Sequence, residues 1–345
     1  MNIFHHDTLS QNTHTQDTLP PLTARQSPWR RVGHSLLREA TTDPDLAICQ
    51  AGLDWQVERV DLRSADTLEA IPDFSAIRRC DTGRYLGVVG ADYTPVQNRE
   101  VFRFFADLAE DKRFTIETAG SFQGGKIVWA MAHLPDLGIR IGDDESKTYL
   151  FISNGHTGNK TLTVAPTTIR IICQNTLALA EAQARGRRKH PGLSGGFTVR
   201  HTPGIRAALD DIRNAYAQAI ASQKTTQQIY QHLASVPLTS QLERQFMTRL
   251  FGSPAPGESG RTTTIREHRE ARLAGILASP TSQVRGTRDS AFSLFQSIVE
   301  YVDHDRTTRT HDGATEDESR LVSATQGTGA ALKRQAWDSI LELAA

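Results

Sequence analysis

Apolar and polar residues alternate along the middle of the chain, and apolar residues recur at helical spacing toward its end. Two β-rich runs flank residues 123–125, which predicts a hairpin over residues 113–134. Residues 149–180 read as a strand, a Gly/Asn turn, a second strand and a helix. With further strands expected over 54–62 and 84–97, the pattern indicates an antiparallel β-meander of about five or more strands.

Helical spacing flanks this meander on both sides. Val101, Phe104, Phe105 and Leu108 follow the helical period after Asn98, which is the expected N-cap. From Gly204 onward the chain is mainly helical. Helices are expected over residues 205–220, 241–251, 265–278, 290–303 and 332–343, with loops over 252–260 and 310–320.

These patterns predict the α+β fold class, with helices flanking the antiparallel meander and a mainly helical C-terminal half. Residues 1–28 are rich in Thr, Gln, His, Asp and Pro, and we expect a disordered tail there. Residues 29–203 are then expected to form the α+β domain. Residues 204–345 are expected to pack on it as a helical region.

The composition says more about the cellular compartment of the protein than about its function. The chain has 345 residues, of which 38% are apolar, and its formal net charge is zero, so electrostatic arguments must be local. Its three cysteines lie far apart, which does not suggest a disulfide framework. The N-terminal stretch does not resemble a signal peptide, and no apolar run is long enough to cross a bilayer. We therefore expect a cytoplasmic protein without membrane association.

The charge is concentrated in one window. Residues 146–209 hold nine basic residues and one acidic residue, Glu181, which gives a local charge of plus eight. The densest part, "RGRRKHPGLSGGFTVRH", combines cations with glycines that would let a loop follow a phosphate backbone. Such a loop would also suit an acidic protein. The residues expected to contact nucleic acid are Lys126, Lys160, Arg170, Arg185, Arg187, Arg188, Lys189 and Arg200, and Phe122 is expected to stack on a base.

Two groups of residues could carry chemistry instead. Cys173, His156 and Asn175 could form a nucleophile with its base, but the "IRIIC" strand favours a core cysteine, and Asn175 suits a helix cap. The carboxylates of residues 143–145 could hold Mg²⁺, but consecutive side chains on a turn diverge, so the sequence favours a solvated hairpin tip. No catalytic residue, metal site or cofactor is assigned.

Residues 120–126, "GSFQGGK", match the spacing of a phosphate-binding loop. That loop needs Ser or Thr next and a helix after it, whereas this chain has Ile127 and a predicted strand. The sequence therefore favours a hairpin turn with a basic edge.

Several motifs in order resemble one family. They are "YTPVQNREVFRFF", "ETAGSFQGGKIVWAMAHLP", "TYLFISNGHTGNKTLTVAPTTIRIICQNTL", "VRHTPGI", "VEYVDHDR" and "GTGAALKRQAW". Across about residues 29–345 the chain resembles the phage/plasmid-like protein family, a domain of unknown function (DUF932). The resemblance implies a protein of a mobile genetic element and brings no established activity.

A basic β-meander with helices is also similar in outline to single-strand annealing recombinases, which hold strands in a basic groove on an oligomeric ring. This likeness implies a DNA-binding protein of recombination or replication, with single-stranded DNA as the favoured partner and a homo-oligomer as the working form. Two other classes stay open. One is an enzyme centred on Cys173 or the carboxylates, and the other is a scaffold or host antagonist that binds a protein.

Overall fold

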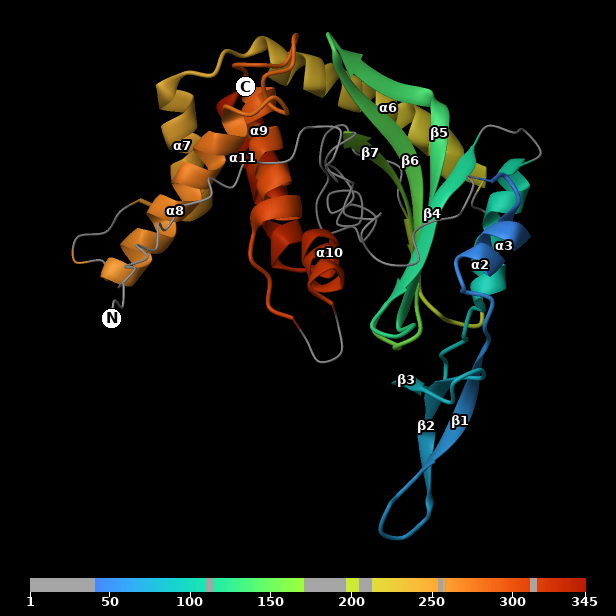
Figure 1. The fold of residues 1–345 in the computed structure, drawn as a ribbon. Helices are drawn as coiled ribbons and strands as arrows, with labels where there is room; N and C mark the ends of the chain where they lie inside the picture. Colours follow the sequence, from blue (N-terminus) through green and yellow to red (C-terminus); the bar gives the residue numbers. More distant parts are fainter. Residues whose placement is uncertain are drawn as a thin grey trace, which may run out of the picture.

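The computed structural model describes residues 41–109, 114–170, 197–204, 213–253, 257, 259–310 and 315–345 (Figure 1). Arg185, Arg187, Arg188, Lys189, Cys173 and Asn175 lie outside these ranges, as does the predicted N-terminal tail. The strands are β1 (Val57–Arg63), β2 (Ala70–Arg79), β3 (Tyr85–Gly90), β4 (Thr115–Phe122), β5 (Ile127–Ile141), β6 (Asp144–Gly155), β7 (Leu162–Arg170) and β8 (Phe197–Val199). The helices are α2 (Pro44–Gln50), α3 (Asn98–Ala109), α6 (Arg213–Ser235), α7 (Ser240–Phe251), α8 (Gly260–Leu277), α9 (Ala291–Glu300), α10 (Glu316–Gln326) and α11 (Thr328–Leu343).

The larger sheet is an antiparallel meander in the order β4-β5-β6-β7-β8. A smaller antiparallel sheet, β1-β2-β3, lies beside one end of it (Figure 1). The mainly helical half follows in sequence, so the predicted α+β class and its antiparallel meander are confirmed. The domain boundary predicted after residue 203 stays a prediction.

Both faces of the larger sheet are covered, and β5 shows how. Val128, Ala130 and Ala132 belong to a core shared with α2 and α3. The alternate residues Trp129 and Met131 belong to a second cluster that includes Leu321 of α10. Successive strand residues point to opposite faces, so a strand that is buried on both faces reads as the continuous apolar run "IVWAMA".

A third core holds the helical half together. It is built on aromatic rings, among which Tyr230 and Phe292 lie 5.0 Å apart between centroids and Phe295 and Trp337 lie 5.1 Å apart. These edge-to-face contacts join α6, α9 and α11. Aromatic pairs in this geometry stabilise the core beyond the burial of their apolar surface. Ile139 of β5 enters the same cluster, so the far end of the larger sheet is part of this core. None of the described helices combines the length and the apolar composition that a bilayer span requires.

Three expectations about secondary structure were wrong in detail. The second half of the loop predicted over 310–320 is the start of α10, which Thr315 caps by accepting from the Glu318 backbone N–H at 3.1 Å. The β2 strand was not predicted, because Pro72 and the positive φ of Asp73 (64°) interrupt its alternation. Asn98 is the first residue of α3 rather than its N-cap, and its side chain makes other contacts.

Candidate functional site

An open polar pocket of about 740 Å³ lies between β3, the turn from β6 to β7, and the residues after β8. Two of the predicted cations, Lys160 and Arg200, line it. Asp92 is the one carboxylate among its lining residues, which otherwise include Val88, Val89, two aromatic rings, hydroxyls and an amide. The pocket thus has mixed polar and apolar walls, and its lining holds more positive than negative side chains.

Antiparallel topology brings the cations together. Alternate turns of a meander lie at the same end of the sheet, so Lys126, before β5, and Lys160, before β7, are neighbours in space. The backbone N–H of His156 donates to the Lys126 carbonyl at 2.9 Å, which ties the two turns together. Because β8 runs back along β7, Arg200 reaches the same end. We call this region the pocket end of the sheet: residues 123–126, 156–161 and 200–202.

Glycine permits the tight approach of Lys160 to the sheet. A Cβ on Gly155 would lie 2.2 Å from the Lys160 Cβ, so any larger residue would displace the lysine. Gly87 of β3 has the same role against the other side of the turn, since a Cβ there would lie 2.8 Å from the Thr157 Cα. The turn is therefore wedged between the two sheets, and its position is fixed by backbone contact.

Stacked rings form one wall of the pocket. The ring planes of Tyr93 and His201 are 4.8 Å apart between centroids and inclined by 16°. Thr94 and His201 are joined through the backbone, because the Thr94 N–H donates to the His201 carbonyl at 3.0 Å. The Tyr93 hydroxyl donates to the Gly155 carbonyl at 3.0 Å, which links this wall to β6. Burial lowers the pKa of His201 and raises the pKa of Tyr93, so both rings are neutral near pH 7.

His156 lies behind the pocket, where its buried side chain and that of Asn98 form a hydrogen-bonded pair, which we call the clasp. Its Nε2 lies 2.9 Å from Asn98 Oδ1, and Asn98 Nδ2 donates to the carbonyls of Leu53 and Trp55. Since the amide nitrogen is used as the donor, Asn98 Oδ1 is the acceptor and His156 Nε2 carries the proton. One side-chain pair thus connects β6, α3 and the segment before β1.

This environment does not suit a general base. Burial lowers the pKa of His156 to about 3, and electrostatic repulsion from His201 and the Arg79 guanidinium adds to the effect. The imidazole is therefore neutral and weakly basic at physiological pH. Its partner in the described chain is Asn98, while Cys173 and Asn175, the other members of the predicted group, lie outside the described residues.

Lys126 follows a tight hairpin turn, as predicted, and leads into a strand rather than a helix. The turn residues Gln123, Gly124 and Gly125 all have positive φ, of 52°, 69° and 101°. The Arg84 guanidinium lies against Gly124, where a Cβ would come within 2.1 Å of it. Arg79 donates to the Gly124 carbonyl at 3.3 Å and lies over the Trp55 ring at 4.0 Å. The smaller sheet therefore brings two arginines to the pocket end, of which Arg79 also forms an ion pair with Asp81 at 2.6 Å.

Phe122 does not have the role expected of it. It is almost fully buried, and its ring stacks on Trp129 with centroids 5.7 Å apart. The prediction that Phe122 stacks on a base is wrong, because the last residue of β4 points into the sheet core rather than out from the hairpin tip.

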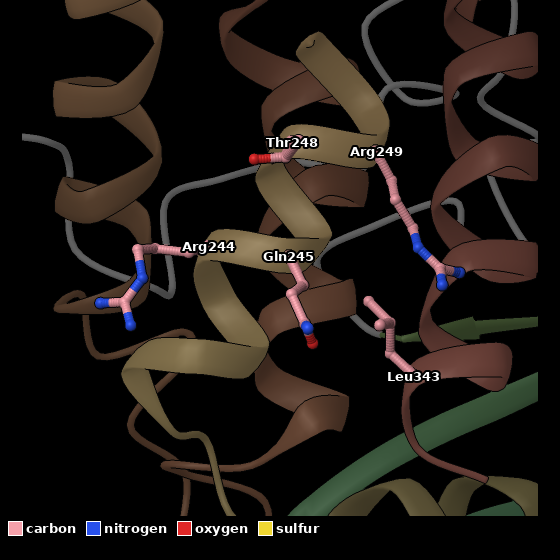
Figure 2. Close-up of a pocket in the computed structure, with 5 residues that line it drawn as sticks. All are labelled: Arg244, Gln245, Thr248, Arg249 and Leu343. Atoms are coloured by element: carbon pink, nitrogen blue, oxygen red, sulfur yellow. The ribbon is translucent and has the colours of Figure 1, made fainter. Parts of the chain in front are cut away.

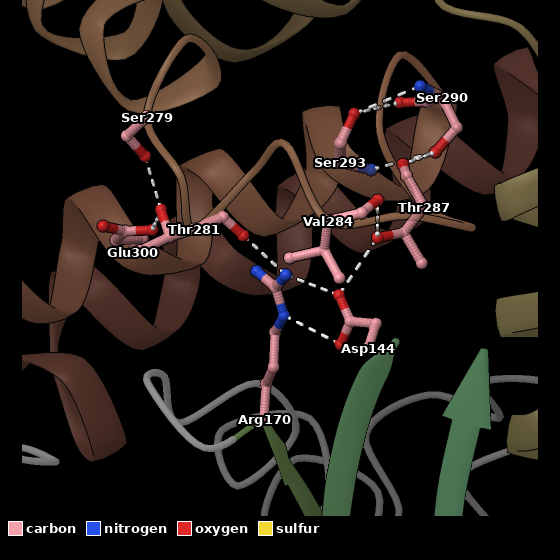
Figure 3. A network of polar contacts seen from close by, with 9 residues as sticks. All are labelled: Asp144, Arg170, Ser279, Thr281, Val284, Thr287, Ser290, Ser293 and Glu300. Atoms are coloured by element: carbon pink, nitrogen blue, oxygen red, sulfur yellow. Dashed lines mark hydrogen bonds and ion pairs between the residues drawn. The ribbon is translucent and has the colours of Figure 1, made fainter. Parts of the chain in front are cut away.

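Arg170 lies at the opposite end of the sheet from the pocket. Figure 3 shows its contacts with Asp144 and Thr281. It is buried and forms an ion pair with Asp144 at 2.5 Å, and it also donates to the Thr281 carbonyl at 2.6 Å. Thr287 donates to the same carboxylate at 3.1 Å. The guanidinium is thus engaged within the protein, where it joins the sheet to the loop between α8 and α9.

The three carboxylates considered for Mg²⁺ do not converge. Asp143 pairs with Arg285 at 2.7 Å, Asp144 is buried with Arg170, and Glu145 pairs with Arg140 at 3.2 Å. The solvated tip expected at residues 143–145 is therefore wrong for Asp144. Across the described ranges, no group of three or more His, Cys, Asp or Glu side chains could hold a metal ion.

A smaller pocket of about 310 Å³ lies in the helical half (Figure 2). Four residues of α7 and Leu343 of α11 line it. Arg249 forms an ion pair with Glu342 at 2.6 Å, and Arg244 points away from it to the other side of α7. The two guanidinium groups do not converge on a common ligand position, so this pocket is a weaker candidate than the one at the pocket end.

A family model described as "Domain of unknown function (DUF932)" matches residues 85–325. The chain belongs to this family. Comparisons with curated proteins and with solved structures found no match.

The DUF932 stretch contains β3, the larger sheet and most of the helical half, so Lys126, Lys160 and Arg200 all lie inside it. Sequence reasoning missed the residues that shape the pocket, above all Tyr93, Asn98 and His201. A signal was present, because Thr-Pro follows directly after Tyr93 and after His201 in "DYTPVQN" and "VRHTPGI". Pro restrains both segments to extended backbone, and the two segments meet at the Thr94–His201 hydrogen bond.

Proposed function

We propose that this DUF932 protein binds single-stranded nucleic acid at the pocket end of its larger sheet. The observation that carries the proposal is that Lys160 and Arg200, 40 residues apart in sequence, line one open pocket, while Lys126 lies on the adjoining turn. Separated cations that gather on one surface are the electrostatic footprint expected for a phosphate backbone.

The surroundings of these cations favour phosphate over a carboxylate-rich protein surface. Glycine-rich turns bring backbone N–H groups and small hydroxyls to the same surface, and both are common donors to phosphate oxygens. Within the described part of the chain, no ion pair neutralises Lys126 or Arg200. The predicted contacts Arg185, Arg187, Arg188 and Lys189 lie outside the described residues and stay a prediction.

A single strand is preferred to a duplex in this proposal because a concave pocket of this size accepts one flexible backbone more readily than a stiff rod. Annealing of single strands during recombination or replication of a mobile element is the biological step we propose. It is supported by the resemblance to phage/plasmid-like proteins and by a fold-level analogy. A homo-oligomer would be the working form.

The test is fluorescence anisotropy with labelled single-stranded and duplex oligonucleotides over a salt series. We expect binding to single strands, with the logarithm of the association constant falling linearly with the logarithm of the salt concentration. Each lost phosphate contact should reduce the slope by about 0.7. The double variant Lys160→Gln/Arg200→Gln should therefore bind more weakly and with a slope smaller by roughly 1.4.

A matched control is Arg140→Gln. Arg140 is exposed near the opposite end of the sheet, and its neutralisation should leave affinity and slope unchanged. Absence of binding by the wild-type protein at low salt would refute the proposal, and an acidic protein partner would then be sought. Equal losses in the control and in the double variant would show that the pocket end is not the site.

A further inference from the structure

The smaller sheet has one packed face and one open face. Directly paired residues of neighbouring strands lie on the same face, so the register assigns Ile77 and Val89 to one face and Phe74, Tyr85 and Val88 to the other. Ile77 and Val89 are buried in the core with α2 and α3. Phe74, Tyr85 and Val88 are 53%, 57% and 56% exposed.

This open face adjoins the polar pocket. Val88 and Gly90 of β3 line the pocket, and Phe74 on β2 pairs directly with Gly90. Since Gly90 has no side chain, the Phe74 ring has no neighbour across the strand pair to cover it. The β3 strand is therefore a shared border, with cations on one side of it and exposed rings on the other.

The two exposed rings are separated along the sheet. Phe74 pairs with Gly90, whereas Tyr85 pairs with Arg78, four residues farther along β2. At about 3.3 Å per residue this places the rings roughly 13 Å apart along the strand. Stacked bases rise about 3.4 Å per nucleotide on one strand, so the rings span about four base steps.

We infer that the open face of the smaller sheet is a base-stacking platform for the single strand whose phosphates lie at the pocket end. This inference rests on the proposed function. Exposed aromatic rings on an antiparallel sheet stack bases because every base presents a flat π-face, and the adjoining cations of the pocket end neutralise the backbone.

The charges on the smaller sheet favour one path for the nucleic-acid strand across its open face. Asp66, Glu69 and Asp73 occupy the far part of the β1–β2 hairpin. At its other end Arg84 lies against the β4–β5 turn, and the one carboxylate of the β2–β3 turn, Asp81, is paired with Arg79. A polyanion would therefore extend from the Phe74 position toward Tyr85 and Arg84 and not toward the hairpin tip. A protein partner held by apolar contact alone would have no such polarity.

The platform is tested by removing the aromatic rings from the protein and, separately, the bases from the oligonucleotide. The variants Phe74→Ala and Tyr85→Ala are each measured against a labelled oligothymidylate and an oligonucleotide of the same length with abasic sites. We expect each substitution to weaken binding to the base-containing strand by roughly 5- to 100-fold. The loss should be much smaller on the abasic strand, and Tyr85→Phe should bind within about twofold of wild type.

Salt dependence separates this inference from the proposed function. Stacking releases no counterions, so Phe74→Ala should weaken binding at an unchanged salt slope, whereas Lys160→Gln/Arg200→Gln should reduce the slope. Ile265→Ala is the control, because Ile265 is an equally exposed apolar residue on α8, far from the pocket end.

Three outcomes would overturn the platform. If wild type binds, the cation variant weakens binding and the ring variants bind normally, the platform is wrong and the proposed function stands. If the ring variants instead change the mass of the protein in light scattering without a base-dependent loss, the open face holds a second copy. If wild type does not bind, the proposed function and the platform both fail.

Discussion

The Arg170 guanidinium and the Asp144 carboxylate form a buried two-point ion pair, with Nε–Oδ1 at 2.9 Å and Nη2–Oδ2 at 2.5 Å (Figure 3). The pair lies where the ends of β6 and β7 meet the α8–α9 loop, and both side chains are almost fully removed from water. It therefore belongs to the packing between the sheet and the helical half.

Arg170→Ala should reduce the free energy of unfolding by about 3–5 kcal/mol, because it leaves the Asp144 carboxylate buried without its counter-charge. Urea unfolding followed by circular dichroism measures the change. Arg285→Ala is the matched control, since it removes an exposed arginine from the neighbouring Asp143 and should change the free energy of unfolding far less than Arg170→Ala does. A loss below 1 kcal/mol for Arg170→Ala would contradict the buried pair.

Asn98→Ala should destabilise the fold by about 2–4 kcal/mol. The substitution leaves the carbonyls of Leu53 and Trp55 and the His156 Nε2–H without their partner in a buried position. Thermal or urea unfolding measures the loss. Asn159→Ala removes an exposed amide from the nearby turn and should change stability by about 0.5 kcal/mol or less, so equal effects of the two variants would argue against the clasp.

Stability should depend on pH through His156. Its pKa is about 3 in the folded protein and about 6.5 in an unfolded chain, so above pH 6.5 it is neutral in both states and contributes no pH dependence. As pH falls below 6.5, the unfolded state binds a proton that the folded state does not, and stability decreases by up to about 1.4 kcal/mol per pH unit.

The measurement is urea unfolding of wild type and His156→Gln over a pH series from neutral to mildly acidic. The carboxylates titrate in both proteins, so their contribution cancels in the difference. The stability advantage of wild type should shrink as pH falls below 6.5. A difference that stays constant with pH would show that His156 accepts a proton in the folded state.

Two glycines of β3 provide a test of how the pocket is positioned. A Cβ on Gly87 would lie 2.8 Å from the Thr157 Cα, so Gly87→Ala must push the turn that carries Lys160 away from the smaller sheet. We expect a loss of about 1–3 kcal/mol in unfolding free energy together with weaker oligonucleotide binding. Gly90→Ala adds the same group to the same strand in open space, and its stability should stay within about 0.5 kcal/mol of wild type. Indistinguishable variants would mean that the turn adapts freely.

The secondary structure of the larger sheet was accessible from sequence because its signals are local. The turn at residues 123–125 and the apolar alternation around it specify the β4–β5 hairpin without help from distant residues. The acidic start of α10 was misjudged as a loop, although acidic residues in a first turn stabilise a helix through its dipole. The β2 strand depends on partners on both sides, and its own letters contain a proline and an aspartate that oppose it.

The candidate site could be predicted only in part from the sequence, because the contacts that define it join residues far apart in the chain. A sequence gives the charge of Arg170 and of Lys160 but not their partners. The carboxylate and the carbonyl that accept from Arg170 are 26 and 111 positions away. Lys160 and Arg200 stand in one pocket because strand order places them there. Likewise, Phe122 and Phe74 are both strand phenylalanines, and only the packing of each sheet decides that the first is buried and the second exposed.

The walls of the pocket come from residues 88–93, 157–161 and 200–202. The pocket therefore cannot form during synthesis until the last of these three segments has been made. A nascent chain would already have its β4–β5 hairpin while Tyr93 still lacked the His201 ring that stacks on it. Because contacts between such distant segments form late and slowly, about 200 residues must be synthesised before the pocket exists. A chain that ended within β7 would contain Lys126 and Lys160 but would lack Arg200 and His201, which complete the pocket.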